Sequence, residues 1–207
     1  MTDAKPHVWT VGHSNQTLDD FVALLRRHEI TAVTDVRSTP FSRFTPQFNK
    51  DALQRGLKAT GIKYVFLGRE LGARSDDPTC YEHGRVQYAR LAKTDLFQQG
   101  LDRLIRGAAE HRIAVMCAEK EPLECHRTIL VARALVGRRV EVDHILSSGQ
   151  VETHADAMIR LLRIVGIPRE DLFRSGDELI EEALARQEER IAYVDEKLAG
   201  EAEGTAP

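Results

Sequence analysis

Cysteine is scarce in this chain of 207 residues, since only Cys80, Cys117 and Cys125 occur. An odd number of cysteines excludes a fold in which every thiol is paired within the chain, and it favours reduced thiols in the cytoplasm. The sequence has no run of about 18 apolar residues, and its first six residues show no basic stretch followed by an apolar one. We therefore expect a cytoplasmic protein with no secretory signal and no membrane partner.

Several motifs that identify common enzyme classes are also missing. Gly12 is not followed by further glycines at the spacing of a dinucleotide-binding loop, and neither a P-loop nor a Gly-x-Ser-x-Gly turn occurs. Closely spaced cysteine or histidine pairs, which are typical of zinc sites, are absent as well. Any function must therefore be inferred from residues that are distant in the sequence.

Charge is distributed unevenly along the chain, whose formal net charge is −3. Residues 1–166 carry 24 Lys and Arg against 20 Asp and Glu, whereas residues 167–207 carry 5 against 12. Neither balance is extreme enough to require a nucleic-acid partner. We expect an α/β domain over residues 1–166, which is followed by an acidic helical extension over residues 167–207 with a disordered end.

Short apolar runs alternate with segments of helical periodicity. Strand, helix, strand repeats imply right-handed crossovers and a mostly parallel sheet. The sequence therefore predicts an α/β fold in which helices flank a mostly parallel sheet. The expected strands are 7–13, 31–36, 62–67, 112–118 and 140–146, and the expected helices are 17–29, 49–60, 87–110 (as one piece or two), 122–136 and 155–165. Residues 68–85 are expected to form a long polar loop in which Cys80 is exposed.

The acidic extension contains a narrow apolar seam. Its residues are Ile180, Leu184, Ile191, Val194 and Leu198, with Gln187 as a polar interruption. This spacing predicts one C-terminal amphipathic helix over residues 177–198. The seam either packs on the domain or pairs with a second copy of the chain, so a homodimer through this helix stays open.

Reactive or charged side chains follow every expected strand. In a parallel sheet the carboxyl ends of the strands lie along one edge, where ligands bind. We therefore expect a shared site at this edge. Its candidate residues are His13, Ser14, Asp35, Arg37, Ser38, Arg43, Arg69, Cys117, Glu119, Cys125, His126, Arg127 and His144.

Cys125 is the candidate nucleophile. Pro122 favours the first turn of a helix, which would place Cys125 near a helix N-terminus beside His126 and Arg127. These neighbours would stabilise a thiolate, although a small buried thiol is the alternative. Glu119 is a candidate general base, and His13 or His126 would move protons.

The arginines at the strand ends suggest an anion site. Guanidinium groups bind phosphate and carboxylate with two hydrogen bonds. The candidate anion-binding residues are Arg37, Arg43, Arg69, Arg127, Ser14, Ser38 and Asp35. Alternatively, internal pairing with Asp35, Glu70 or Glu119 would neutralise these arginines.

Two further interpretations compete with an anion-binding enzyme. Cys117, Cys125 and His144 are candidate ligands of zinc or iron, although we expect no metal or other cofactor. Arginines interleaved with Phe41, Phe44 and Phe48 are also typical of surfaces that bind single-stranded nucleic acid. A metal-binding protein and a nucleic-acid-binding module therefore remain alternatives.

Three segments resemble one known family. Gly12-His13-Ser14, Asp35-Val36-Arg37-Ser38 and Cys117-Ala118-Glu119 with Cys125-His126-Arg127 are similar to the motifs of domain-of-unknown-function family 488. The resemblance covers residues 7–146 and implies an α/β fold with a common site. Because the family has no settled activity, the resemblance implies no reaction.

From the residues themselves we expect an enzyme that acts on an anionic substrate, either phosphate-bearing or nucleotide-like. Its site would combine cysteine and arginine at the carboxyl edge of the sheet. A hydrolase or a transferase with a cysteine nucleophile fits these expectations best.

Overall fold

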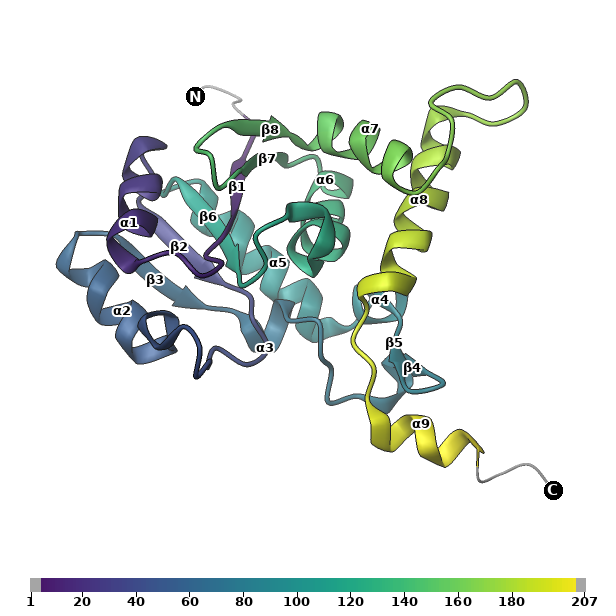
Figure 1. Cartoon of the computed structure of the whole chain (residues 1–207), viewed down its shortest axis with the longest axis horizontal. Helices are drawn as coiled ribbons and strands as arrows, with labels where there is room; N and C mark the ends of the chain where they lie inside the picture. The colour runs from purple at the N-terminus through teal and green to yellow at the C-terminus, as the bar shows by residue number, and fades with distance from the viewer. Residues whose placement is uncertain (1–4, 204–207) are drawn as a thin grey trace.

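The computed structural model describes residues 5–203 and contains a six-stranded sheet (Figure 1). The strand order is β3-β2-β6-β1-β7-β8. All pairings are parallel except the antiparallel pair of β7 and β8. The strands are β1 (His7–Gly12), β2 (Ala32–Asp35), β3 (Lys63–Phe66), β6 (Ile113–Cys117), β7 (Glu141–Ile145) and β8 (Val151–Thr153). This arrangement is the predicted α/β fold.

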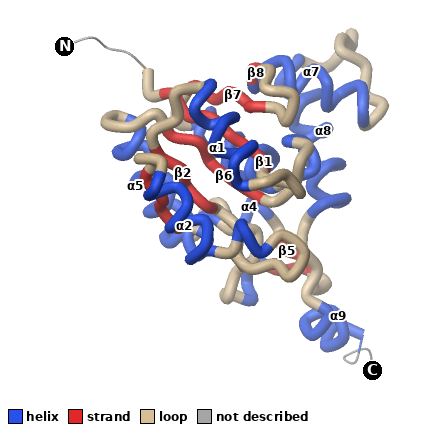
Figure 2. The backbone as a smooth tube through the Cα atoms, turned by 60° about the vertical axis from the view of Figure 1, so that its left-hand side comes forward, coloured by secondary structure: helices blue, strands red, loops and turns tan. Residues whose placement is uncertain are grey.

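Helices cover both faces of the sheet, as Figure 2 shows. The helices α1 (Leu18–Arg27) and α2 (Lys50–Ala59) pack on one face. Residues of β6 alternate between the faces: Ala114 and Met116 join the core under α1 and α2, whereas Val115 and Cys117 join the core on the opposite face. The larger helices on that opposite face are α5 (Asp95–Ala108), α7 (His154–Ile164) and α8 (Gly176–Ile191).

Smaller elements connect these layers. The segment after β3, which we expected to be a polar loop, contains α3 (Gly68–Leu71) and the hairpin of β4 (Tyr81–Glu82) and β5 (Arg85–Val86). The short helix α4 (Tyr88–Leu91) precedes α5, so the helical segment expected over residues 87–110 forms two helices, which was one of its two interpretations. None of the helices within residues 5–203 combines the length and the apolar composition of a membrane span.

The expected helix over residues 122–136 is interrupted at Cys125, the candidate nucleophile. A 3₁₀ turn spans Pro122–Glu124, and Cys125 then has extended backbone, with φ −139° and ψ 141°. A π-helical segment (Arg127–Ala132) follows and continues into α6 (Arg133–Gly137). Cys125 therefore lies within one turn of a helix N-terminus, as predicted, but the helix begins after Cys125 and not at Pro122.

The C-terminal helix is present, but the prediction of one helix over residues 177–198 is wrong. Helix α8 ends at Ile191, and α9 (Glu196–Glu203) begins after an extended segment. The residues that α8 buries are Leu179, Ala183, Leu184 and Gln187, while Val194 of the expected seam is 40% exposed. The expected disordered end falls partly on residues 204–207, which lie outside the described residues.

Candidate functional site

A cavity of about 280 Å³ opens at the carboxyl edge of the sheet. Its lining contains Cys117 from the end of β6 and Cys125 and His126 from the turn before the π-helical segment. Glu119 lies between them in sequence and also lines the cavity, as does Arg37 from the loop after β2. The cavity therefore gathers residues from two neighbouring strand ends.

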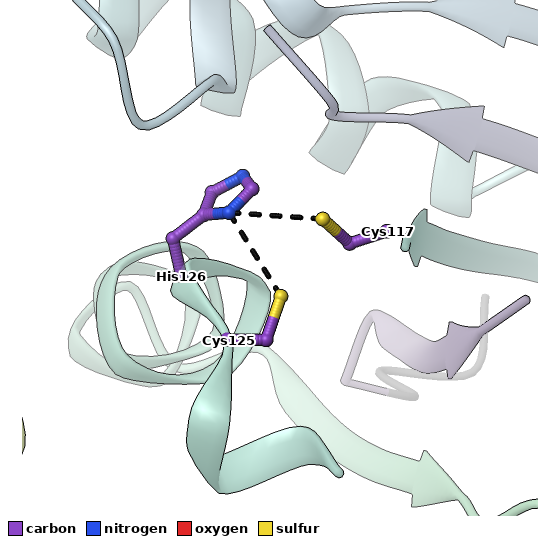
Figure 3. A group of neighbouring side chains, drawn as sticks. All are labelled: Cys117, Cys125 and His126. Carbon is purple, nitrogen blue, oxygen red and sulfur yellow. Dashed lines mark hydrogen bonds between the residues drawn. The ribbon is translucent and has the colours of Figure 1, made fainter. Parts of the chain in front are cut away.

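The backbone explains why the two thiols meet. Cys117 is the last residue of β6 and faces the core that also contains Cys125. The extended backbone of Cys125 turns its side chain toward this strand end. Figure 3 shows both sulfur atoms beside the imidazole of His126, whose Nδ1 lies 3.7 Å from Sγ of Cys117 and 3.8 Å from Sγ of Cys125.

Cys125 has the surroundings of a thiolate. Its Sγ lies 2.9 Å from Oε2 of Glu119, a separation at which the two groups share one proton, and it accepts a hydrogen bond from the backbone N–H of Arg127 at 3.4 Å. Burial would raise the pKa of Cys125. The hydrogen bond from Cys117 and the positive charges of Arg127 and His126 outweigh burial and hold this pKa well below its usual value.

The proton is held by the groups that surround Sγ of Cys125. Burial and the charge of Cys125 raise the pKa of Glu119. Burial alone would lower the pKa of His126, but the Cys125 thiolate raises it overall. The pKa of Cys117 is well above its usual value because this thiol is buried beside Cys125. Three proton-holding groups thus surround a single sulfur that loses its proton easily.

One backbone contact orients the imidazole of His126. Its Nε2–H donates to the carbonyl oxygen of Val36 at 3.1 Å. In the neutral ring this leaves Nδ1 without a proton, so that Nδ1 presents its lone pair to the two sulfur atoms. The ring can therefore either take a proton from a thiol or bind a metal ion through Nδ1.

Arg37 is fixed by a buried network. It donates from Nε and NH2 to the two carboxylate oxygens of Asp35, at 2.9 and 2.7 Å, and from NH2 to the carbonyl of Phe48 at 2.8 Å. NH1 lies 3.1 Å from Nε2 of His13. Because a guanidinium group has five N–H donors, one NH1 hydrogen remains for a ligand in the cavity.

His13 acts on Arg37 rather than on the cavity. Its Nδ1–H donates to the carbonyl of Ser14 at 2.7 Å, which leaves Nε2 to accept from Arg37. Its ring stacks on Phe48. Burial, together with the charge of Arg37, lowers the pKa of His13 to about 4. A neutral imidazole that does not line the cavity is suited to positioning Arg37.

Arg127 is also placed away from the cavity lining. Its side chain is 1% exposed, and it donates from NH1 to the carbonyl of Glu119 at 2.7 Å and from NH2 to the carbonyl of Lys120 at 3.2 Å. Its Nε has no hydrogen-bond partner. Arg127 therefore clamps the loop after β6, and its charge reaches Cys125 through the protein interior.

The remaining candidates divide between the cavity and other places. Ser38 lines the cavity, and its hydroxyl accepts a hydrogen bond from the backbone N–H of Arg74 at 3.1 Å. Arg69 and Ser14 line two other clefts, and Arg43 is exposed. Asp35 reaches the site through Arg37.

His144, which we considered as a metal ligand with the two cysteines, is paired elsewhere. Its Nδ1 lies 2.7 Å from the Thr10 hydroxyl, and its Nε2 lies 3.1 Å from Nδ1 of His154. Within residues 5–203, the cluster suited to a metal ion is Cys117, Cys125 and His126, whose ligand atoms all lie within 4.8 Å of one another. The third ligand is therefore the histidine adjacent to Cys125 in sequence.

Sequence reasoning missed several residues of the cavity lining, among them Arg74, Tyr88, Ile191 and Tyr193. The Tyr88 side chain is 2% exposed, and its hydroxyl makes no hydrogen bond to the described part of the chain. Burial and the charges of Cys125 and Glu188 raise its pKa, so the hydroxyl stays protonated. No motif marks these positions, because they come from the hairpin region and from the C-terminal extension.

The family described as "Domain of unknown function DUF488" matches residues 17–134. The chain belongs to this family. The DUF488 match includes Arg37, Cys117 and Cys125, and it ends before α8. Searches for similar curated proteins and for similar solved structures found no significant match.

Proposed function

We propose that the protein is an enzyme in which the Cys125 thiolate attacks a small substrate that carries an anionic group of the phosphate class. The reaction would be hydrolysis or transfer of that group. One observation carries the proposal: Sγ of Cys125 lies beside Glu119, His126 and the Arg127 amide in the wall of a cavity that Arg37 also lines.

The residues support a two-step reaction on a phosphate monoester. The thiolate forms a bond to phosphorus while the bond from phosphorus to the ester oxygen breaks, and protonated Glu119 gives its proton to the leaving oxygen. Water then attacks the phosphorylated cysteine and loses a proton to the Glu119 carboxylate. This step releases phosphate and restores the thiolate. In a transferase an alcohol would replace the water.

Arg37 is suited to bind the anionic group before and during the reaction. It keeps one free NH1 hydrogen, and its orientation is fixed by Asp35 and His13. A guanidinium group that is held in place before the substrate binds stabilises developing negative charge without rearrangement. The pairing with Asp35 that we considered as an alternative thus positions Arg37 and leaves one donor available.

The burial of two of the candidate arginines argues against a nucleic-acid-binding module. Arg37 is 6% exposed and Arg127 is 1% exposed, so neither can reach the backbone of an extended nucleic acid. Phe41 and Phe44 are exposed at 64% and 95% on a neighbouring loop. Binding by that loop would weaken steeply with salt, which filter binding of an oligonucleotide at several salt concentrations would measure.

A metal centre is a second candidate function, because the spacing of the Cys117, Cys125 and His126 atoms favours it. Tetrahedral zinc with bonds of about 2.0–2.3 Å holds its ligands roughly 3.5 Å apart, close to the two observed sulfur–nitrogen distances. Zinc or iron bound here would take up the Cys125 thiolate as a ligand. Elemental analysis of the purified protein and of Cys117→Ser distinguishes the two functions, since only a metal centre gives one equivalent of metal that the variant loses.

The proposed enzyme is tested by alkylation with iodoacetamide at neutral pH, followed by mass spectrometry of each cysteine peptide. We expect Cys125 to react much faster than Cys117 and Cys80, and inorganic phosphate to slow its reaction. A phosphate monoester should be hydrolysed by the wild type and not by Cys125→Ser.

The matched control is Cys80→Ser, which removes a buried thiol that does not line the cavity and should keep the hydrolysis. Slow and equal labelling of all three cysteines in the folded protein would contradict the proposal. Loss of hydrolysis in both serine variants would also contradict it, because the effect would then not belong to Cys125.

A further inference from the structure

The outer wall of the cavity comes from the C-terminal extension. Ile191, the last residue of α8, and Tyr193, in the extended segment that follows, both line the cavity that contains Cys125. Figure 1 shows α8 and this segment passing beside α4, β4 and β5. The DUF488 match ends at residue 134, so this wall is built by residues outside the matched segment.

The extended segment is held firmly against the hairpin of β4 and β5. The backbone N–H of Val86 donates to the carbonyl of Tyr193 at 3.0 Å, and the N–H of Asp195 donates to the carbonyl of Gly84 at 2.7 Å. Residues 193–195 thus add a short strand to the hairpin, with Arg85 and Val194 forming a β-bridge.

Glycine is required where the two segments approach each other. Gly84 has φ +74°, a conformation that L side chains rarely adopt. A Cβ atom there would also lie 2.7 Å from the carbonyl oxygen of Asp195. The close approach of residues 193–195 to the hairpin therefore depends on glycine at position 84.

Helix α8 is anchored by two polar contacts besides its buried apolar residues. The Glu188 carboxylate accepts a hydrogen bond from the backbone N–H of Tyr88 at 2.6 Å. The buried amide of Gln187 donates to the carbonyl of Leu123 at 2.7 Å. These two hydrogen bonds tie α8 to segments that line or adjoin the cavity. The position of the cavity's outer wall relative to the Cys125 thiol is therefore fixed.

The wall has a flat, cationic surface. The guanidinium group of Arg74 lies over the Tyr193 ring, 4.3 Å from its centroid. Among the side chains that the structure describes, no carboxylate pairs with Arg74. Its backbone is tied to Ser38, which follows Arg37 in the chain. A positive charge and an aromatic ring therefore stand together at the outer end of a cavity whose inner end holds Arg37 and Cys125.

We propose that Tyr193, with Ile191 and Tyr88, determines specificity by selecting phosphate monoesters whose organic group is flat and aromatic. This inference rests on the proposed function, because it uses the phosphate position near Arg37. The phosphate lies beside Arg37 and Cys125 at the inner end, and the aromatic group lies against the tyrosine rings at the outer end.

The size and chemistry of the cavity favour this substrate class. A volume of about 280 Å³ is at the lower end of the range of roughly 300–1,000 Å³ that is typical of small-molecule sites. The space suits one ring attached to one phosphate. Stacked aromatic pairs are stabilised beyond the area that they bury, so the rings favour an aromatic ester over a bare anion.

Protection of Cys125 from iodoacetamide measures the selectivity without requiring turnover. The wild type is alkylated in the presence of inorganic phosphate or phenyl phosphate, and the half-protecting concentration of each is determined. We expect phenyl phosphate to protect at a concentration about tenfold lower, which corresponds to roughly 1.4 kcal/mol. Tyr193→Leu keeps an apolar side chain but removes the ring, and it should reduce the difference to under about threefold while the phosphate value stays unchanged.

Two variants serve as controls. Tyr193→Phe keeps the ring and should behave as the wild type. Val194→Ala changes the adjacent residue, which does not line the cavity, and should also behave as the wild type. If phenyl phosphate protects no better than phosphate, or if Tyr193→Leu keeps the full difference, the specificity inference is overturned. If neither anion protects the wild type, the proposed function itself fails.

Discussion

The substitution Gly12→Ala tests how closely the site is built onto the sheet. Gly12 is the last residue of β1, and a Cβ atom built there would lie 1.9 Å from the carbonyl oxygen of Glu119 and 3.2 Å from NH2 of Arg127. Ordinary contact begins at 3.4 Å, so the loop after β6 must move by about 1.5 Å. That carbonyl accepts the 2.7 Å hydrogen bond from Arg127, which a displacement of this size breaks.

The expected cost follows from two contributions. Overpacking of a buried position costs about 1–3 kcal/mol. A buried hydrogen bond to a charged group contributes about 1.5–3 kcal/mol, and Arg127 already has an unpaired Nε. The free energy of unfolding should therefore fall by roughly 3–6 kcal/mol, which is a large part of the stability of a typical domain.

Urea denaturation measured by circular dichroism gives this free energy. Gly137→Ala is the matched control, because a Cβ atom at the exposed end of α6 meets nothing within 4 Å. That variant should gain about 0.4–1 kcal/mol from the stiffer unfolded chain. A Gly12→Ala variant that loses less than about 1 kcal/mol would refute the steric reasoning.

Three further predictions concern single side chains. Burial, the neighbouring His154 and two arginines lower the pKa of His144 from 6.5 to about 3, so the unfolded chain binds a proton there that the folded chain does not. The stabilising contribution of neutral His144 should be fully present above pH 6.5 and fall as the pH drops toward 3. Between pH 7 and pH 5 the free energy of unfolding measured with urea should fall by about 2 kcal/mol because of His144. The variant His144→Gln should lack this part of the pH dependence. Arg37→Lys should cost about 2 kcal/mol because lysine cannot pair with both carboxylate oxygens of Asp35, whereas exposed Arg43→Lys should change stability by less than about 0.5 kcal/mol in the same urea experiment. Glu119→Gln should lower the turnover of a phosphate monoester by a factor of about 100 to 10,000, and an unchanged turnover would remove Glu119 from the proton transfers.

The parallel sheet could be predicted from the sequence because its central strands β1, β2 and β6 are buried on both faces and appear as apolar runs. The strand β8 was missed because Val151–Thr153 is short and only partly buried at the edge of the sheet. The break after Ile191 was missed for another reason. It depends on backbone pairing with Val86, more than 100 residues earlier, which leaves no local pattern.

The candidate site, too, could be predicted from the sequence only in part. The expected approach of Arg37 to the two cysteines followed from the parallel sheet alone, because residues that follow parallel strands meet at one edge. The structure adds that the two strands, β2 and β6, are neighbours. The sequence could not show that Arg127 turns inward to two carbonyls, or that His126 rather than His144 adjoins both sulfur atoms. Tyr88 and Tyr193 were not anticipated because the hairpin and the extension bring them to the cavity only in three dimensions. Cys80, which we expected to be exposed, is buried in the core.

The position of β1 in the sheet has a consequence for how the protein is made. This strand is synthesised before both of its partners, since it pairs only with β6 and β7 among the described strands, and its first partner residue, Ile113, follows Val8 by more than 100 residues. At about 5–20 residues per second, a ribosome needs roughly 5–20 s to reach that partner. During this interval Trp9 and Val11 have no sheet to join, and Gly12 has no loop to contact. Nascent chains should therefore depend on chaperones until β6 emerges, and the surroundings of Cys125 can form only after β6 and the segment that follows it have been made.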